Sequence, residues 1–244
     1  MTLSEQLIET KFGIALTQVL APLTGKHMEI FLDSKDPYLK YDDIGDAKEK
    51  KIKKIGHYYG LLQTVFEDIE MVLAFLRINE RKDIQKIYPS IENQESYFRY
   101  HVENYFIRMV TITDLVGKLA NSIFDPGMDE IKCNAYLFRD KIHQTDPQCA
   151  HLVNLIIEST RTIKEKRHQK IHEGKTNLDY FEGIVFWDEL AKIIRTDANP
   201  LLDKLTTDSI ANEIDILEKD IREIIALIVN FTDYSTDKFI AIAK

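Results

Sequence analysis

Residues 46–76 read DAKEKKIKKIGHYYGLLQTVFEDIEMVLAFL, and this stretch decides the fold of the chain. Apolar side chains recur in it at alternating steps of three and four residues: Ile52, Ile55, Tyr59, Leu62, Phe66, Ile69, Leu73 and Leu76. This spacing places them on one face of an α-helix for about four heptads. Asp46 is a suitable N-cap for that helix. The stretch therefore predicts a long amphipathic helix that packs against partners through one face.

Three further stretches repeat the pattern. The apolar positions are Phe98, Val102, Tyr105, Met109, Ile112, Val116, Leu119 and Ile123 in the first; Cys149, Val153, Ile156, Thr160 and Ile163 in the second; and Ile210, Ile214, Leu217, Ile221, Ile224, Ile228 and Phe231 in the third. Turn residues at 125–127 end the first, and Asp146-Pro147 begins the second as N-cap and first helical residue. Further helices are expected within 129–143 and near 178–196.

No stretch of comparable length alternates apolar and polar residues with period two, so no strands are expected. The sequence therefore predicts an all-α fold, an up-down bundle of four to five long helices with crossing angles of about 20°. Residues 46–244 would form this bundle. Residues 1–45 would form an irregular N-terminal appendage, in which a first helix is followed by a less regular stretch punctuated by Pro22, Gly25, Pro37 and Gly45.

Composition narrows the class of protein. The 244 residues include only 9 Gly and 6 Pro, which fits long helices better than many short strands. No apolar run is long enough to cross a bilayer, and the N-terminus lacks the order of a signal peptide. Cys133 and Cys149 are expected as reduced thiols in a cytoplasmic protein. The net charge of −8 argues against a protein that coats nucleic acid generally, although it allows a local basic cleft.

One segment reverses the overall charge. Residues 161–175 contain six Lys or Arg and two Glu, a net charge of +4 with neutral histidines. Arg167 also falls where the apolar face of residues 149–163 would continue by another step of four. An inward-facing guanidinium is costly unless it is paired or faces water. Arg167 therefore points either into solvent beyond the core or into a polar cleft.

The residue types in this segment suit phosphodiester chemistry. Four of the seven histidines fall within thirty residues, namely His143, His151, His168 and His172. Histidine transfers protons near neutral pH, and arginine presents a planar fork to phosphate oxygens. Together they could hold a phosphodiester and deprotonate a ribose 2′-hydroxyl without a metal or another cofactor.

Arg167-His168-Gln169-Lys170-Ile171-His172 resembles the R-x4-6-H motif of the HEPN superfamily. This resemblance implies a small α-helical bundle of a kind found among bacterial defence and toxin–antitoxin proteins. It also implies a metal-independent RNase that works as a homodimer with both motifs facing one cleft. His172 would be the general base and Arg167 the phosphate ligand, with His168, Lys170 and Lys166 as further phosphate contacts. His168 stands where the family often has Asn.

Three other residues are candidates for supporting roles in such a cleft. Arg139 and His143 form a shorter Arg/His pair that could line a second wall, although a surface helix end is the alternative. Glu103 could orient Arg167 or His172, although a solvated helix face is the alternative. Tyr97, Phe98, Tyr100, Tyr105 and Phe106 could stack bases, although aromatic residues in such a pattern more often form core.

Two other functions stay open at this point. The bundle could be a non-catalytic interaction module that dimerises or binds an antitoxin or regulatory protein. It could also hold a metal, because His168 and His172 have the i, i+4 spacing of metal ligands. Neither a carboxylate nor a cysteine completes such a set locally, so no metal ligand is assigned.

Overall fold

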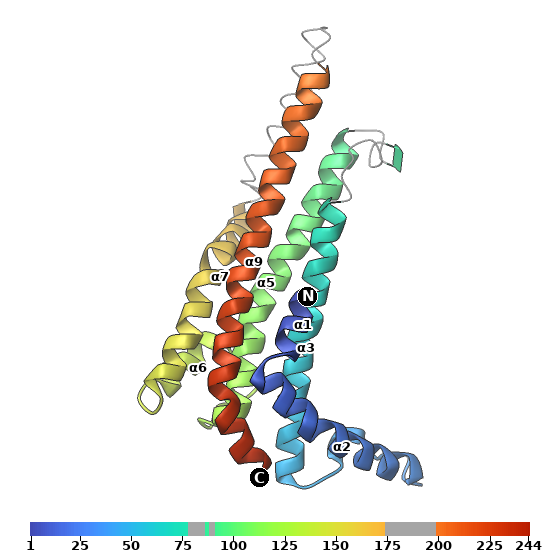
Figure 1. Ribbon diagram of the computed structural model, residues 1–244, viewed down its shortest axis with the longest axis vertical. Helices are drawn as coiled ribbons and strands as arrows, with labels where there is room; N and C mark the ends of the chain where they lie inside the picture. Colours follow the sequence, from blue (N-terminus) through green and yellow to red (C-terminus); the bar gives the residue numbers. More distant parts are fainter. Residues whose placement is uncertain (78–85, 88–90, 174–198) are drawn as a thin grey trace. The chain divides into compact units, whose positions relative to one another are not determined.

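The computed structural model describes residues 1–77, 86–87, 91–173 and 199–244. Within these ranges the chain forms α-helices and no strands, and the helices pack as a bundle, which confirms the all-α prediction (Figure 1). The helices are α1 (Leu3–Ile8), α2 (Lys11–Asp33), α3 (Ala47–Arg77), α5 (Ile91–Phe124), α6 (Ala135–Ile142), α7 (Pro147–Glu173) and α9 (Asn199–Ala243). The helix expected near 178–196 lies outside the described residues.

The chain divides into two compact units. Unit 1 comprises Met1–Glu67, Thr111–Ser159 and Ile224–Lys244, and unit 2 comprises Asp68–Val110 and Thr160–Glu223. The division falls within α3, α5, α7 and α9, so each unit contains segments of all four long helices. Unit 1 also contains α1, α2 and α6.

The ends of the long helices follow the local sequence. The Asp46 carboxylate accepts from Glu49 N at 2.8 Å, and Glu49 Oε2 accepts from Asp46 N at 3.1 Å, a reciprocal cap at the start of α3. Asp146 Oδ1 accepts from Cys149 N at 2.9 Å at the start of α7. After α5, the left-handed φ values of 53° at Asp125 and 75° at Gly127 turn the chain. These three boundaries were predicted from the sequence.

The N-terminal segment is more regular than expected. Pro22 and Gly25 lie inside α2, which continues to Asp33, so the prediction of a less regular stretch from Pro22 onward is wrong as far as Asp33. A proline inside a helix removes one backbone hydrogen bond, and the other bonds of this 23-residue helix continue on both sides of it. Leu7, Phe12 and other apolar residues of α1 and α2 are buried in unit 1.

The core of unit 1 joins the N-terminal helices to the long ones. The Phe12 ring lies 5.2 Å from the Tyr59 ring and 5.3 Å from the Phe239 ring, measured between centroids. Tyr59 donates to the Leu7 carbonyl at 2.5 Å.

Both cysteines of the chain are buried free thiols, and burial raises the pKa of Cys133 to about 11. These thiols are therefore protonated near neutral pH.

α6 is anchored in unit 1 through its apolar side. Ala135 and Phe138 are fully buried and Ile142 is nearly so, while the Phe138 ring lies 6.2 Å from the Phe124 ring of α5. Asn134 caps the helix by accepting from Leu137 N at 3.0 Å. The neighbouring face of α6 carries Arg139 and leads to the C-cap residue His143, so the backbone of both is part of a packed helix.

Unit 2 buries the apolar faces predicted for its helices. Phe98, Tyr105 and Met109 of α5 are buried, as are Leu76 of α3 and Leu217 of α9. The Tyr105 hydroxyl donates to the Leu217 carbonyl at 2.8 Å, and burial raises the pKa of that hydroxyl well above its usual value. Arg77 Nε donates to Glu218 Oε1 at 2.5 Å on the surface.

None of the described helices is long and apolar enough to span a membrane.

Candidate functional site

The R-x4-H motif lies on the last turns of α7. That helix is continuous from Pro147 to Glu173, so Arg167 and His172 both belong to it. The apolar face that precedes them is confirmed, because Cys149, Val153, Ile156, Thr160 and Ile163 are all buried. The side chains of Lys166, Arg167, His168, Lys170 and His172 lie outside the described ones, so their roles remain predictions.

The helical backbone of α7 limits how the motif can work within one chain. Successive residues of an α-helix are rotated by about 100°, so residues five apart point in directions about 140° apart. α7 is helical through both Arg167 and His172. Positions 167 and 172 are therefore about 140° apart around the helix axis.

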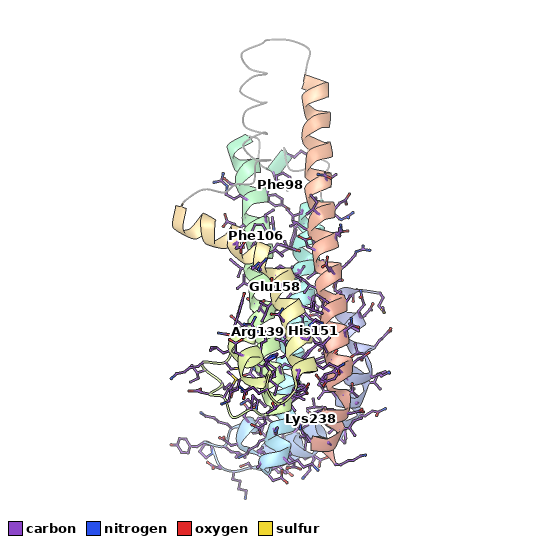
Figure 2. The ribbon with its side chains drawn as sticks, turned by 90° about the vertical axis from the view of Figure 1, so that its left-hand side faces the viewer. Phe98, Phe106, Arg139, His151, Glu158 and Lys238 are labelled. Carbon is purple, nitrogen blue, oxygen red and sulfur yellow. The ribbon has the colours of Figure 1, made fainter. Side chains whose placement is uncertain are left out.

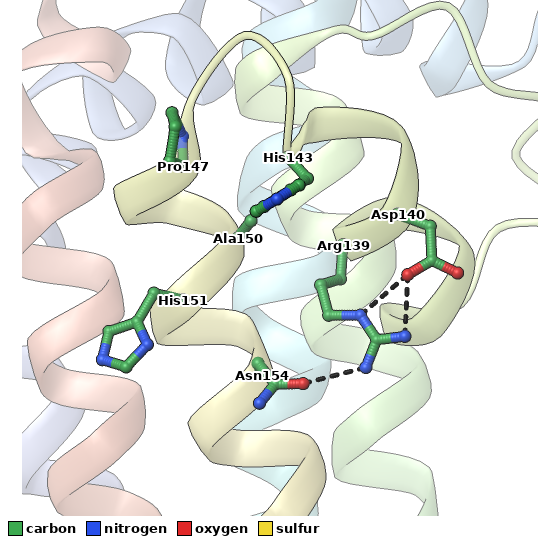
Figure 3. Close-up of a pocket in the computed structure, with 7 residues that line it drawn as sticks. All are labelled: Arg139, Asp140, His143, Pro147, Ala150, His151 and Asn154. Atoms are coloured by element: carbon green, nitrogen blue, oxygen red, sulfur yellow. Dashed lines mark hydrogen bonds and ion pairs between the residues drawn. The ribbon is translucent and has the colours of Figure 1, made fainter.

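A second Arg/His segment lies on α6, and the structure places it in a hollow. The hollow has a volume of about 470 Å³ and is lined by Arg139, Asp140, His143, Pro147, Ala150, His151 and Asn154 (Figure 3). Arg139 and His143 are four residues apart, which puts them on the same face of α6. Pro147, Ala150, His151 and Asn154 share a face of α7 for the same reason. The hollow is therefore a groove between two helices of unit 1, which we call the α6–α7 groove. Figure 2 labels one residue from each of these helices, Arg139 and His151.

The Arg139 guanidinium is held from two sides in this groove. Its Nε and Nη2 lie 2.8 and 2.7 Å from Asp140 Oδ1, and its Nη1 donates to Asn154 Oδ1 at 2.8 Å (Figure 3). The Arg139 side chain is 29% exposed, whereas the Asp140 side chain is 64% exposed. An arginine has five N–H donors. Two of them have no partner among the described residues, so they remain available to an acceptor in the groove.

The histidines of the groove differ in their orientation. Figure 3 shows His143 reaching from α6 toward α7, as Arg139 does, whereas His151 points away from Arg139. Both histidines are exposed. His143 is the C-cap of α6, and its backbone N–H donates to the Arg139 carbonyl at 3.1 Å. Arg139 and His143 are thus the pair that can contact one ligand together, with His151 at the rim.

Sequence reasoning named Arg139 and His143 but missed Asn154. The signal was present, because Asn154 stands seven residues after Pro147 and beside the buried Val153. A polar residue in that position flanks the apolar face of α7 and therefore borders whatever helix packs there. The sequence did not show that α6 is the neighbouring helix or that Arg139 donates to Asn154.

The remaining candidate for a supporting role belongs to unit 2. Glu103 is half-buried on α5 in unit 2, and nothing in the structure tests its contact with Arg167 or His172. Arg108, close to it, has its Nε 3.1 Å from Asp68 Oδ2 and donates to Asn104 Oδ1 at 3.0 Å. The polar face near Glu103 therefore contains an ion pair between α3 and α5.

The aromatic group of α5 divides into core and surface residues. Phe98, Tyr105 and Phe106 are buried, so they cannot stack on bases, whereas Tyr100 is 62% exposed. His101 stacks on Phe75 with ring centroids 5.1 Å apart.

Among the side chains that the structure describes, no group of three or more His, Cys, Asp or Glu could hold a metal ion.

Comparison with known families agrees with the all-α architecture. The family model described as Cthe2314-like HEPN matches residues 40–236, which is more than half of the chain. No curated protein and no solved structure matches. HEPN domains are typically RNase-type domains. On the strength of that match, and of a helical bundle with a basic Arg/His segment, this chain belongs to the HEPN family.

Proposed function

We propose that this chain is a metal-independent endoribonuclease of HEPN type that acts as a homodimer. The observation that carries the proposal is the family match over residues 40–236, which includes the whole Arg167–His172 motif. The net charge of +4 over residues 161–175 supports a polyanionic substrate, because the chain as a whole carries −8.

In the proposed reaction His172 takes the proton of a ribose 2′-hydroxyl. The 2′-oxygen then forms a bond to the adjacent phosphorus, and the bond from phosphorus to the 5′-oxygen of the next nucleotide breaks. The products are a 2′,3′-cyclic phosphate and a 5′-hydroxyl, which takes up a proton. Arg167 stabilises the charge that develops on the phosphate oxygens, and His168, Lys170 and Lys166 contact neighbouring phosphates.

The geometry of α7 supports the proposed homodimer. Positions 167 and 172 are about 140° apart around the axis of a continuous helix, so they do not share a face within one chain. In a symmetric dimer the same segment of both chains faces a shared cleft. Arg167 of one protomer and His172 of its partner then meet across that cleft. Glu103 has a supporting role in this proposal, as a carboxylate that orients one of the two.

The test is cleavage of a mixed fluorescent RNA panel in EDTA by wild type, His172→Ala and His57→Ala. His57 is an exposed histidine of α3 that controls for the loss of an imidazole as such. Cleavage by wild type and His57→Ala that is lost in His172→Ala supports the proposal. Equal cleavage by all three proteins would show that His172 takes no part in the chemistry.

A second function is favoured by the same helical geometry. If the two motifs do not face each other across a dimer, the separation of positions 167 and 172 around the axis of α7 suits a non-catalytic module that binds an antitoxin or another regulatory protein. Absence of cleavage by any variant, together with a monomeric wild type in sedimentation, would support this alternative.

A further inference from the structure

We infer that the α6–α7 groove binds a phosphate group of a single RNA strand, with Arg139 and His143 as its ligands. This inference rests on the proposed function for its choice of ligand, since the groove itself specifies only a phosphate-sized anion beside an apolar wall. The groove would be a second RNA-binding site, located in unit 1, besides the motif residues of α7.

The donors of the groove suit a tetrahedral anion. Arg139 keeps two N–H groups for an acceptor while the other three are engaged by Asp140 and Asn154. Those contacts fix the guanidinium plane, so little side-chain freedom is lost when a ligand binds. His143 lies one helical turn further on the same face and adds a ring N–H.

The walls of the groove suit a nucleotide attached to that phosphate. Pro147 and Ala150 supply apolar surface, and a volume of about 470 Å³ lies within the range of small-ligand pockets. The groove is open on the exposed side, where His143 and His151 lie. A chain of nucleotides can therefore continue beyond it, which a closed pocket would prevent.

Among the described residues that line the groove, Asp140 is the one acidic side chain, and it provides a direct test of the inference. Its exposed carboxylate partly neutralises Arg139, so it competes with a phosphate for the same guanidinium. If Arg139 serves only to fasten α6 to α7, then removing the charge of Asp140 weakens the structure and improves nothing. If Arg139 binds phosphate, the same change strengthens binding.

The experiment measures binding of a fluorescent 2′-O-methyl oligoribonucleotide, which has no 2′-hydroxyl to react. Wild type is compared with Arg139→Gln, Asp140→Asn and Lys141→Gln, whose exposed lysine on α6 does not line the groove. We expect Arg139→Gln to weaken binding about tenfold, which is typical of a lost charge-assisted contact. Asp140→Asn tightens binding, and Lys141→Gln changes it less than about twofold, as suits a screened surface charge.

The salt dependence gives a second readout that does not depend on a change in stability. A plot of the logarithm of the binding constant against the logarithm of the salt concentration has a negative slope. Loss of one phosphate contact reduces the magnitude of that slope by about one. We expect this decrease for Arg139→Gln, whereas Arg139→Lys keeps the slope and still weakens binding because it lacks the planar fork. Circular dichroism confirms that each variant is folded.

Several results would overturn the inference. Equal binding by wild type and Arg139→Gln, or weaker binding by Asp140→Asn, would remove Arg139 as a phosphate ligand. Weaker binding by Lys141→Gln but not by Arg139→Gln would place the phosphate site elsewhere on α6. Binding of free adenosine monophosphate without binding of the oligonucleotide would assign the groove to a mononucleotide. Because this probe cannot be cleaved, these outcomes are independent of whether His172 is catalytic.

Discussion

The two Arg/His segments of this chain differ by one residue in spacing, and the difference decides what each can do alone. Arg139 and His143 are four apart on α6, so they share a face and line one groove. Arg167 and His172 are five apart, so their positions lie about 140° from each other around the axis of α7. The spacing of the family motif therefore favours a site shared by two chains, whereas the spacing of Arg139 and His143 allows one chain to supply both residues.

The largest expected effect separates chemistry from binding. Arg167→Ala should lower kcat for RNA cleavage by about 10²–10³, because it removes stabilisation of charge that develops only in the transition state. Arg139→Ala should leave kcat unchanged and raise KM, because it removes a contact made equally to substrate and transition state. Steady-state kinetics on one defined RNA measures both. The reverse pattern would place the chemistry on α6.

The second-largest expected effect concerns the packing that holds α6 in unit 1. Phe138 is fully buried against Phe124, so Phe138→Ala should cost about 3–5 kcal/mol of stability and loosen α6. Urea unfolding measures the loss, and oligonucleotide binding should weaken with it. The exposed Leu137 on the same helix provides the control, because Leu137→Ala removes comparable apolar volume from the surface. Equal losses from both variants would mean that α6 does not depend on this packing.

The need for a second chain in the α7 segment can be tested by complementation. Arg167→Ala and His172→Ala are each expected to be inactive, and mixing them in equal amounts after dissociation should restore about a quarter of wild-type activity. Half of the resulting dimers are mixed, and one of their two composite sites has both residues intact. A mixture that stays inactive would mean that Arg167 and His172 act within the same protomer.

The smallest effect tests how firmly Arg139 is held. Asn154→Ala removes the acceptor of one 2.8 Å hydrogen bond from a partly exposed guanidinium. We expect a loss of less than about 1 kcal/mol in urea unfolding, because water can replace the lost acceptor. Binding of the 2′-O-methyl oligonucleotide should weaken only severalfold, through a less fixed guanidinium. A loss of oligonucleotide binding as large as that of Arg139→Gln would indicate that Asn154 is itself a ligand.

The sequence by itself determined the helical part of this protein. Steps of three and four between apolar residues predicted the faces of α3, α5, α7 and α9 that the structure buries, because helical periodicity is a local property. Helix ends with a side-chain cap or a left-handed turn, at Asp46, Asp146 and Asp125, were readable for the same reason. Pro22 was misjudged, because a proline signals a break locally while the rest of α2 tolerates it.

Only the tertiary structure decided which polar residues meet. Arg139 and Asn154 are separated by fifteen residues and two helix ends, and no periodicity relates them. Their contact exists because Phe138 and Ile142 bury one face of α6 and leave the neighbouring face, which carries Arg139, toward α7. That α7 includes both Arg167 and His172 was likewise visible only in the folded chain, because the apolar face that predicted this helix ends at Ile163. Local patterns specify which residues form helices, whereas packing between helices determines which side chains can bind one ligand.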